Sequence, residues 1–196
     1  MVPRRVCSAL FVHVDDLLIA HRLADTQLEE HLRDLESLFH LDRRDGDVWE
    51  YCGKQIVVGP GSFLVSCPKC IAALEDIPLS RDRLRTPSSA LTPSELHSYR
   101  SLLGTLNFAV TWVRGDLMVD TSLAAQRTTK ATVRDAIELN KLAQRARESK
   151  DLSVTVPRNV VTLSKAILLS WGDAAFANAE DEKSMHGFCF GLAEEM

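Results

Sequence analysis

Two short apolar runs separated by an acidic pair open the chain and predict a β-hairpin. Residues 6–14 (VCSALFVHV) and 17–20 (LLIA) have the length and β-branched content of strands, so Asp15 and Asp16 fall at the hairpin tip. Apolar residues then recur every three or four positions over 26–40, which predicts an amphipathic helix that starts with a capping box.

The later pattern predicts a second hairpin, a helical region and a return to strands. Residues 49–58 and 62–66 read as strands joined by a Gly-Pro-Gly turn, and a linker rich in Ser, Arg and Pro follows over 79–90. Thr92, Pro93 and Glu95 mark a helix start. The expected helices run to about Val110 and over 118–126 and 132–149, and the expected strands over 152–156, 166–172 and 185–192.

Length and composition are those of an ordinary protein with one or two domains. The chain has 196 residues, of which 45% are hydrophobic and 26% charged. It holds no apolar run close to the roughly 20 residues of a membrane span, and its first residues lead into a strand. We therefore expect an intracellular protein with no membrane partner.

The adjacent aspartates are the first candidate site. Divalent cations such as Mg²⁺ prefer oxygen ligands, and carboxylates at a tight turn can reach a cation without burying an unpaired charge. Aspartate is also common in turns because it makes local hydrogen bonds, so a turn without a metal explains these residues equally well.

Cys67 and Cys70 form the only closely spaced cysteine pair among five cysteines. A structural zinc site needs four ligands, usually from a second such pair, which the sequence lacks. We interpret the spacing as part of a helix start rather than as a zinc or redox site.

The net charge of −4 argues against a nucleic-acid surface, but the distribution is uneven. Residues 127–150 hold seven basic and three acidic side chains. Such a helical stretch could follow a phosphate backbone, and a solvated helix face is the alternative that we favour. The candidate backbone contacts are Arg127, Lys130, Arg134, Lys141 and Arg145.

Five segments resemble, in the same order, motifs of copia-type LTR-retrotransposon reverse transcriptases. Residues 13–20 (HVDDLLIA) resemble the family's VDD box, and residues 49–58 (WEYCGKQIVV) resemble the "FLGIEI" strand after it. Residues 66–74 resemble the "SQxKYIxxLL" start of the thumb, 99–116 resemble "YRSLVGSLLYLAxTRPD", and 172–190 resemble the "SDADWAGDxxDRKSTSGYCF" opening of ribonuclease H.

The resemblance implies an α+β fold: the C-terminal part of a reverse-transcriptase palm with a helical thumb and connection, followed by the first strands of a ribonuclease H-like domain. The expected divisions are 1–66 (palm remnant with the two hairpins), 67–150 (thumb and connection) and 151–196 (incomplete ribonuclease H-like start). The implied location is the cytoplasm, including virus-like particles, or the nucleus.

The implied chemistry is RNA-directed DNA synthesis with two Mg²⁺ (or Mn²⁺) ions, roughly 3.5 to 4 Å apart, on an RNA/DNA primer-template with a dNTP. By resemblance, Asp15 and Asp16 are the polymerase metal ligands, and Asp173 is the first metal ligand of ribonuclease H. His13, Tyr51, Gly53 and Lys54 are the primer-binding positions, for which an ordinary edge hairpin is the alternative.

The sequence also departs from the family pattern. His13 replaces a tyrosine, Ala175 replaces the second aspartate of its box, Gly115 replaces a proline, and Trp112 and Val113 look like an insertion. The family's third palm carboxylate and its fingers would precede this sequence, so we expect little or no catalysis by this chain alone.

Three hypotheses follow: a segment of an active polyprotein, a decayed element, or a non-catalytic nucleic-acid-binding remnant. The oligomeric state is left open.

Overall fold

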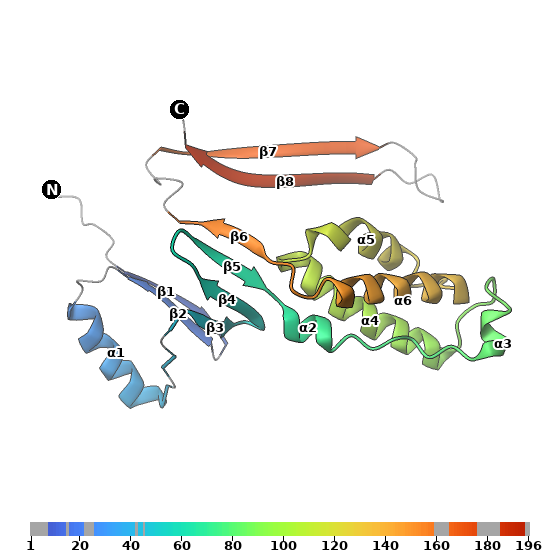
Figure 1. Cartoon of the computed structure of the whole chain (residues 1–196), viewed down its shortest axis with the longest axis horizontal. Coiled ribbons are helices and arrows are strands. Elements are labelled where there is room, and N and C mark those ends of the chain that lie inside the picture. Colours follow the sequence, from blue (N-terminus) through green and yellow to red (C-terminus); the bar gives the residue numbers. More distant parts are fainter. Residues whose placement is uncertain are drawn as a thin grey trace. The chain divides into compact units, whose positions relative to one another are not determined.

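The protein has an α+β architecture, with helices and several small β-sheets (Figure 1). A computed structural model describes residues 8–14, 16–21, 26–41, 43–44, 46–158, 165–175 and 185–194. The chain divides into two compact units, residues 1–156 and 157–196. None of the helices in the described ranges combines the length and the apolar composition that a membrane crossing requires.

The elements of the first unit agree closely with the sequence pattern. In order, they are β1 (Ser8–His13), β2 (Asp16–His21), α1 (Thr26–Phe39), β3 (Val48–Tyr51), β4 (Lys54–Val58), β5 (Ser62–Ser66), α2 (Pro68–Ala72), α3 (Arg81–Leu84), α4 (Pro93–Trp112), the short 3-10 helix η1 (Gly115–Leu117), α5 (Met118–Gln126), α6 (Val133–Glu148) and β6 (Val154–Pro157). The expected first hairpin, the helix after it and the three helices expected between residues 92 and 149 are confirmed.

The expectation of one strand over 49–58 was wrong. The structure turns the chain back at Cys52 and Gly53, so β3 and β4 form a hairpin of their own in a sheet of order β3-β4-β5-β6. The φ angles of Cys52 and Gly53 are 48° and 72°, in the left-handed region that two-residue hairpin turns use. A glycine inside an apparent strand was the signal for this turn.

The buried core of the first unit is mainly helical. Apolar side chains of α2, α4, η1 and α6 pack together because each helix presents an apolar stripe, and the loops between them complete the cluster. Its fully or nearly fully buried members include Cys67, Ile71, Tyr99, Leu106, Ala109, Leu117, Leu139, Ala143 and Ala146.

Helix α4 begins as its sequence predicted. The Thr92 hydroxyl accepts a hydrogen bond from the Glu95 backbone N–H at 3.3 Å, and the Glu95 carboxylate accepts one from the Thr92 backbone N–H at 2.8 Å. Arg83 of α3 donates to both oxygens of Glu95 at 2.9 and 2.8 Å. This pairing with Arg83 is the largest influence on Glu95 and lowers the pKa of its carboxyl group. The linker between α2 and α4 is therefore fixed to the helix start.

A buried arginine closes the opposite end of the helical region. The guanidinium of Arg114 is 1% exposed and donates two hydrogen bonds of 2.8 Å to the carboxylate of Asp116. It also donates to the backbone carbonyls of Ala146 and Ser149 at 3.2 and 3.3 Å and to the Ser149 hydroxyl at 2.8 Å. These carbonyls lie at the C-terminus of α6, where helical hydrogen bonds are missing and positive charge is favoured.

The second unit contains the antiparallel pair β7 (Ala166–Ala175) and β8 (Met185–Glu194). The register places Leu168, Leu192, Phe190 and Phe188 at positions that share one face, and all four side chains are exposed. Trp171 belongs to the other face and is also exposed. Both faces of this hairpin therefore carry uncovered apolar side chains.

We expect Arg114→Met to lower the free energy of unfolding by about 2–4 kcal/mol, because the buried Ala146 carbonyl and the partly buried Ser149 carbonyl each lose a hydrogen bond from a charged donor. Urea unfolding followed by circular dichroism measures this loss. Arg85→Met is the matched control, since the Arg85–Asp82 ion pair is largely exposed, and it should leave the midpoint unchanged. Equal midpoints for all three proteins would contradict the role given to Arg114.

Candidate functional site

The tip of the acidic hairpin contacts the turn of the next hairpin. Asp16 is the first residue of β2 and lies opposite His13 of β1, whose side chain is exposed. One carboxylate oxygen of Asp16, Oδ2, accepts a hydrogen bond from the backbone N–H of Cys52 at 2.9 Å. The VDD segment and the β3–β4 turn, which the sequence separates widely, are therefore neighbours. Asp15 lies outside the described residues.

A pocket of about 460 Å³ opens beside Asp16, between β2, α1 and β3. Its charged lining includes Glu36, Arg43 and Glu50, and Trp49 and Tyr51 add aromatic surface. Several of these charges are already paired. Arg43 forms an ion pair with Glu29 at 3.0 Å, and Glu50 forms one with Lys69 at 2.6 Å.

The described residues do not by themselves fit a two-metal centre. Such a centre needs several carboxylates around the ions, whereas no group of three potential ligands converges anywhere in the described part of the chain. Asp16 supplies one carboxylate, and one of its oxygens already accepts the Cys52 N–H. Mg²⁺ or Mn²⁺ binding at this hairpin remains a prediction that depends on Asp15 and on further ligands.

The predicted primer-binding residues of the second hairpin lie together at the β3–β4 turn. Partial burial is the main cause that raises the pKa of the Tyr51 hydroxyl, followed by its contact with Cys52 and by the negative charge of Asp16. The backbone of Gly53 approaches Phe108 of α4, since a Cβ at this position would lie 3.3 Å from the Phe108 ring. The close backbone approach expected of this glycine is therefore made to a helix.

Lys54 does not extend into solvent, as a primer contact would require. It is 7% exposed, and its ammonium group lies 3.8 Å from the ring centroid of Trp112 and 5.8 Å from that of Phe108. The electron-rich faces of the rings stabilise the buried charge. In this structure Lys54 fastens the hairpin to α4 rather than facing a ligand.

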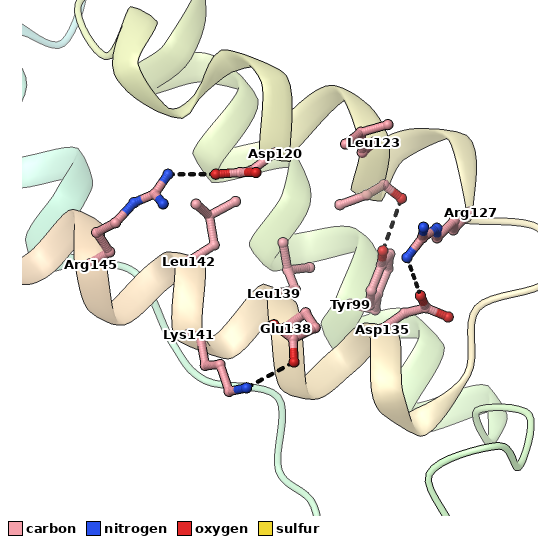
Figure 2. A pocket seen from close by; sticks show the side chains of 11 residues that line it. Tyr99, Asp120, Leu123, Arg127, Asp135, Glu138, Leu139, Lys141, Leu142 and Arg145 are labelled. Carbon is pink, nitrogen blue, oxygen red and sulfur yellow. Dashed lines mark hydrogen bonds and ion pairs between the residues drawn. The ribbon is translucent and has the colours of Figure 1, made fainter. Parts of the chain in front are cut away.

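Three of the five predicted backbone-binding cations line one groove of about 420 Å³ between α4, α5 and α6 (Figure 2). Each is paired with an acid. The pairs are Arg127–Asp135 at 3.1 Å, Lys141–Glu138 at 2.8 Å and Arg145–Asp120 at 2.6 Å. Arg134 is exposed on α6 and does not line the groove. Because the acids neutralise these cations locally, the groove favours the solvated-face interpretation over a phosphate-binding surface.

Tyr99 lines this groove and donates a hydrogen bond to the Ala124 carbonyl at 2.9 Å (Figure 2). Burial, with a smaller effect of the Asp135 charge, raises the pKa of its hydroxyl to about 12. Burial also acts to raise the pKa of Asp135, but hydrogen bonds from Thr132 and the pairing with Arg127 outweigh it, and the pKa is lowered. Tyr99 thus joins α4 to α5, and Asp135 joins the start of α6 to the end of α5.

Asp173, the predicted ribonuclease H ligand, lies on β7 opposite Gly187 of β8. Its carboxylate is exposed and accepts a hydrogen bond from the backbone N–H of Ala174 at 2.9 Å. The acidic run 180–182 lies outside the described residues. In the described part of the second unit, Asp173 is therefore not part of a three-ligand cluster.

Cys67 and Cys70 do not have the environment of reactive thiols. Burial is the main cause that raises the pKa of both, and Cys67 is the residue before the first turn of α2. A raised pKa disfavours the thiolate that metal binding and redox chemistry require. This environment agrees with the interpretation of the pair as part of a helix start.

The sequence analysis did not identify the residues that join the helix ends or that fix the second hairpin to α4. Arg114 and Asp116 were read only as part of a motif, and Trp112 only as an insertion. A signal existed for Trp112, because it lies one helical turn after Phe108, so the two rings can face the same partner. For Arg114 there was none, since its carbonyl partners are more than thirty residues away.

No protein-family model matches this chain, and neither a curated protein nor a solved structure matches it at a significant level. The function therefore has to be inferred from the residues and their contacts.

We expect alkaline pH to destabilise the protein through Tyr99. Its pKa is raised from 10.0 to about 12 on folding, so its contribution is complete below pH 10 and is lost as the pH rises through 12. Tyr99→Phe should cost about 1 kcal/mol at neutral pH, because the Ala124 carbonyl loses a donor, and its deficit should shrink above pH 10. Urea unfolding of both proteins from pH 7 to 11 measures this difference.

The chain has two tyrosines, so absorbance titration of Tyr99→Phe reports Tyr51 alone. A step near pH 10 that the substitution removes from the titration of the folded protein would contradict the burial of Tyr99.

Proposed function

We propose that the chain is a palm and thumb segment of an RNA-directed DNA polymerase of the copia type, followed by the start of a ribonuclease H-like domain. The hydrogen bond from the Cys52 N–H to Asp16 is the observation that carries this proposal. It joins the two segments that the resemblance assigns to the metal site and to the primer terminus. A polymerase needs this proximity, because its metal ions act on the primer 3′-hydroxyl.

Within the proposal, Asp15 and Asp16 would hold Mg²⁺ or Mn²⁺ together with a carboxylate from another segment. The ions would supply charge neutralisation for nucleotidyl transfer. This chain places Asp16 beside the β3–β4 turn, where its Oδ2 accepts the Cys52 backbone N–H at 2.9 Å. The exposed His13 and the partly buried Tyr51 would contact the primer end. The dNTP would be held by a fingers segment.

The helices α4, α5 and α6 would form the thumb and connection. Their packing is well defined, with Tyr99, Leu106 and Leu139 almost completely buried, as expected of a support that holds a duplex at a fixed distance from the acidic hairpin. Asp173 would be the first ligand of the ribonuclease H-like site in the second unit. That site would need the carboxylates that other segments of the domain supply.

The main alternative is a nucleic-acid-binding remnant without catalysis that uses the basic face of 127–150. The contacts support it less well. Arg127, Lys141 and Arg145 are all engaged by acids, and freeing them for phosphates would break these pairs. Its salt-dependent affinity would have to come from the remaining cations, such as Arg134.

The proposal predicts that Asp15→Asn and Asp16→Asn each abolish primer extension. The assay uses a polypeptide in which this chain is joined to the fingers and upstream palm of a copia-type polymerase, with an RNA template, a DNA primer and Mg²⁺. Asp34→Asn, on an exposed position of α1, is the matched control and should extend the primer normally. Extension by either hairpin variant at the control rate would reject the proposal.

Without the further carboxylate, Asp15 and Asp16 would bind a metal ion only weakly, and NMR with a paramagnetic ion detects such weak binding in the chain itself. Mn²⁺ should broaden the NMR signals of residues 16–18 and 52–53, because these lie beside the proposed ligands, and the double Asn variant of Asp15 and Asp16 should abolish the broadening. Broadening that persists in that variant would place the ion elsewhere.

A further inference from the structure

Lys54 is held in an aromatic clamp made by Phe108 and Trp112. A lysine that is 7% exposed has lost most of its hydration, which costs free energy unless another group replaces the water. The Trp112 ring, 3.8 Å from the ammonium nitrogen, and the more distant Phe108 ring provide that replacement through their π-faces. The two rings come from the last turns of α4, so the clamp fixes β4 to this helix.

The neighbouring turn rests on the same helix. Gly53 adopts a φ of 72°, and a Cβ there would come within 3.3 Å of the Phe108 ring. Only glycine combines this backbone conformation with so close an approach at no steric cost. The turn is thus fixed on one side by Phe108 and, one residue earlier, donates the Cys52 N–H to Asp16 on the other side.

These contacts form a continuous path from α4 to the acidic hairpin. Trp112 and Phe108 hold Lys54 and Gly53, these fix the Cys52–Gly53 turn, and the turn orients the Asp16 carboxylate. Trp112 contributes little to the core, because it is 58% exposed while its ring covers Lys54. Because Trp112 is not a member of the core cluster, replacing it tests the clamp without opening the helical core.

We propose that Trp112 and Lys54 are positioning residues, which set the orientation of the Asp16 carboxylate through the Cys52 N–H. The inference rests on the proposed function for its catalytic meaning, and its structural part stands independently. It assigns a role to a tryptophan that the sequence comparison with the copia pattern shows only as an insertion. Through Trp112, a shift of α4 would change the position of the acidic hairpin.

The test uses the full chain and the NMR signal of the Cys52 amide. In the native protein this proton donates to a carboxylate, so it should resonate downfield and exchange slowly, and Asp16→Asn should move it upfield. Trp112→Leu and Lys54→Met should each produce the same upfield movement and accelerate exchange about tenfold, as loss of a desolvated cation–π contact predicts. Lys54→Arg, which keeps the cation over the rings, should restore the native signal.

Trp171→Leu is the matched control, because Trp171 is exposed to a similar degree (56%) and belongs to the other unit. It should leave the Cys52 amide unchanged. An unchanged amide in both Trp112→Leu and Lys54→Met overturns the proposal. Lys54→Met also covers the case in which Trp112→Leu does not fold, and circular dichroism monitors folding.

The effect on catalysis is measured by primer extension with the polypeptide in which this chain is joined to the fingers and upstream palm. Trp112→Leu should lower kcat for primer extension about tenfold and leave the KM for the dNTP unchanged, since the carboxylate and not the nucleotide pocket is displaced. A displaced amide with unchanged kcat overturns the positioning role. If instead Asp16→Asn extends primers normally, the proposed function fails, whereas the amide data still decide whether the clamp orients Asp16.

Discussion

The buried guanidinium of Arg114 is the interaction on which the helical region depends. It lies just after α4 and reaches the last carbonyls of α6, so one side chain joins two helix ends that are distant in the sequence. Asp116 supplies the opposite charge and is 47% exposed, which lets water share in its solvation. The hydrogen bonds from Arg114 are the main cause that lowers the pKa of Asp116, so this stabilisation is lost only as the pH falls below the ordinary range of a carboxylate.

A second layer of polar contacts fixes the connections around this core. The side-chain amide of Asn140 in α6 donates to the Ile77 carbonyl at 3.0 Å and accepts from the Ile77 N–H at 2.8 Å, so it satisfies both backbone groups of that residue. Arg147 donates to the Leu74 carbonyl and pairs with Asp76 at 2.7 Å. Asn140 and Arg147 thus hold the linker before α3, and Arg145 pairs with Asp120, the one acid of α5.

Local signals in the sequence were sufficient for most elements. The acidic tip was bounded by β-branched residues, and Thr92 with Glu95 marked the start of α4, where a side chain and a backbone three residues apart decide the outcome. The Cys52–Gly53 turn was missed because strand-forming residues lie on both sides of it, and Gly53 was the only local signal. Its conformation is fixed by Asp16 and Phe108, which lie far away in the sequence. The same limit applies to the site: candidate acids are visible in a sequence, but the burial of Lys54 is not.

The exposed apolar side chains of the β7–β8 hairpin indicate that this pair of strands unfolds more easily than the helical core. Within the described part of the second unit, each strand pairs only with the other. The Phe188 and Phe190 rings lie 5.3 Å apart, and both are largely exposed. Little buried area therefore opposes separation of the pair, in contrast to the helical core. The two units should therefore unfold as separate cooperative blocks. The amide hydrogens of the hairpin should exchange with solvent through local openings, while those of the helical core stay protected.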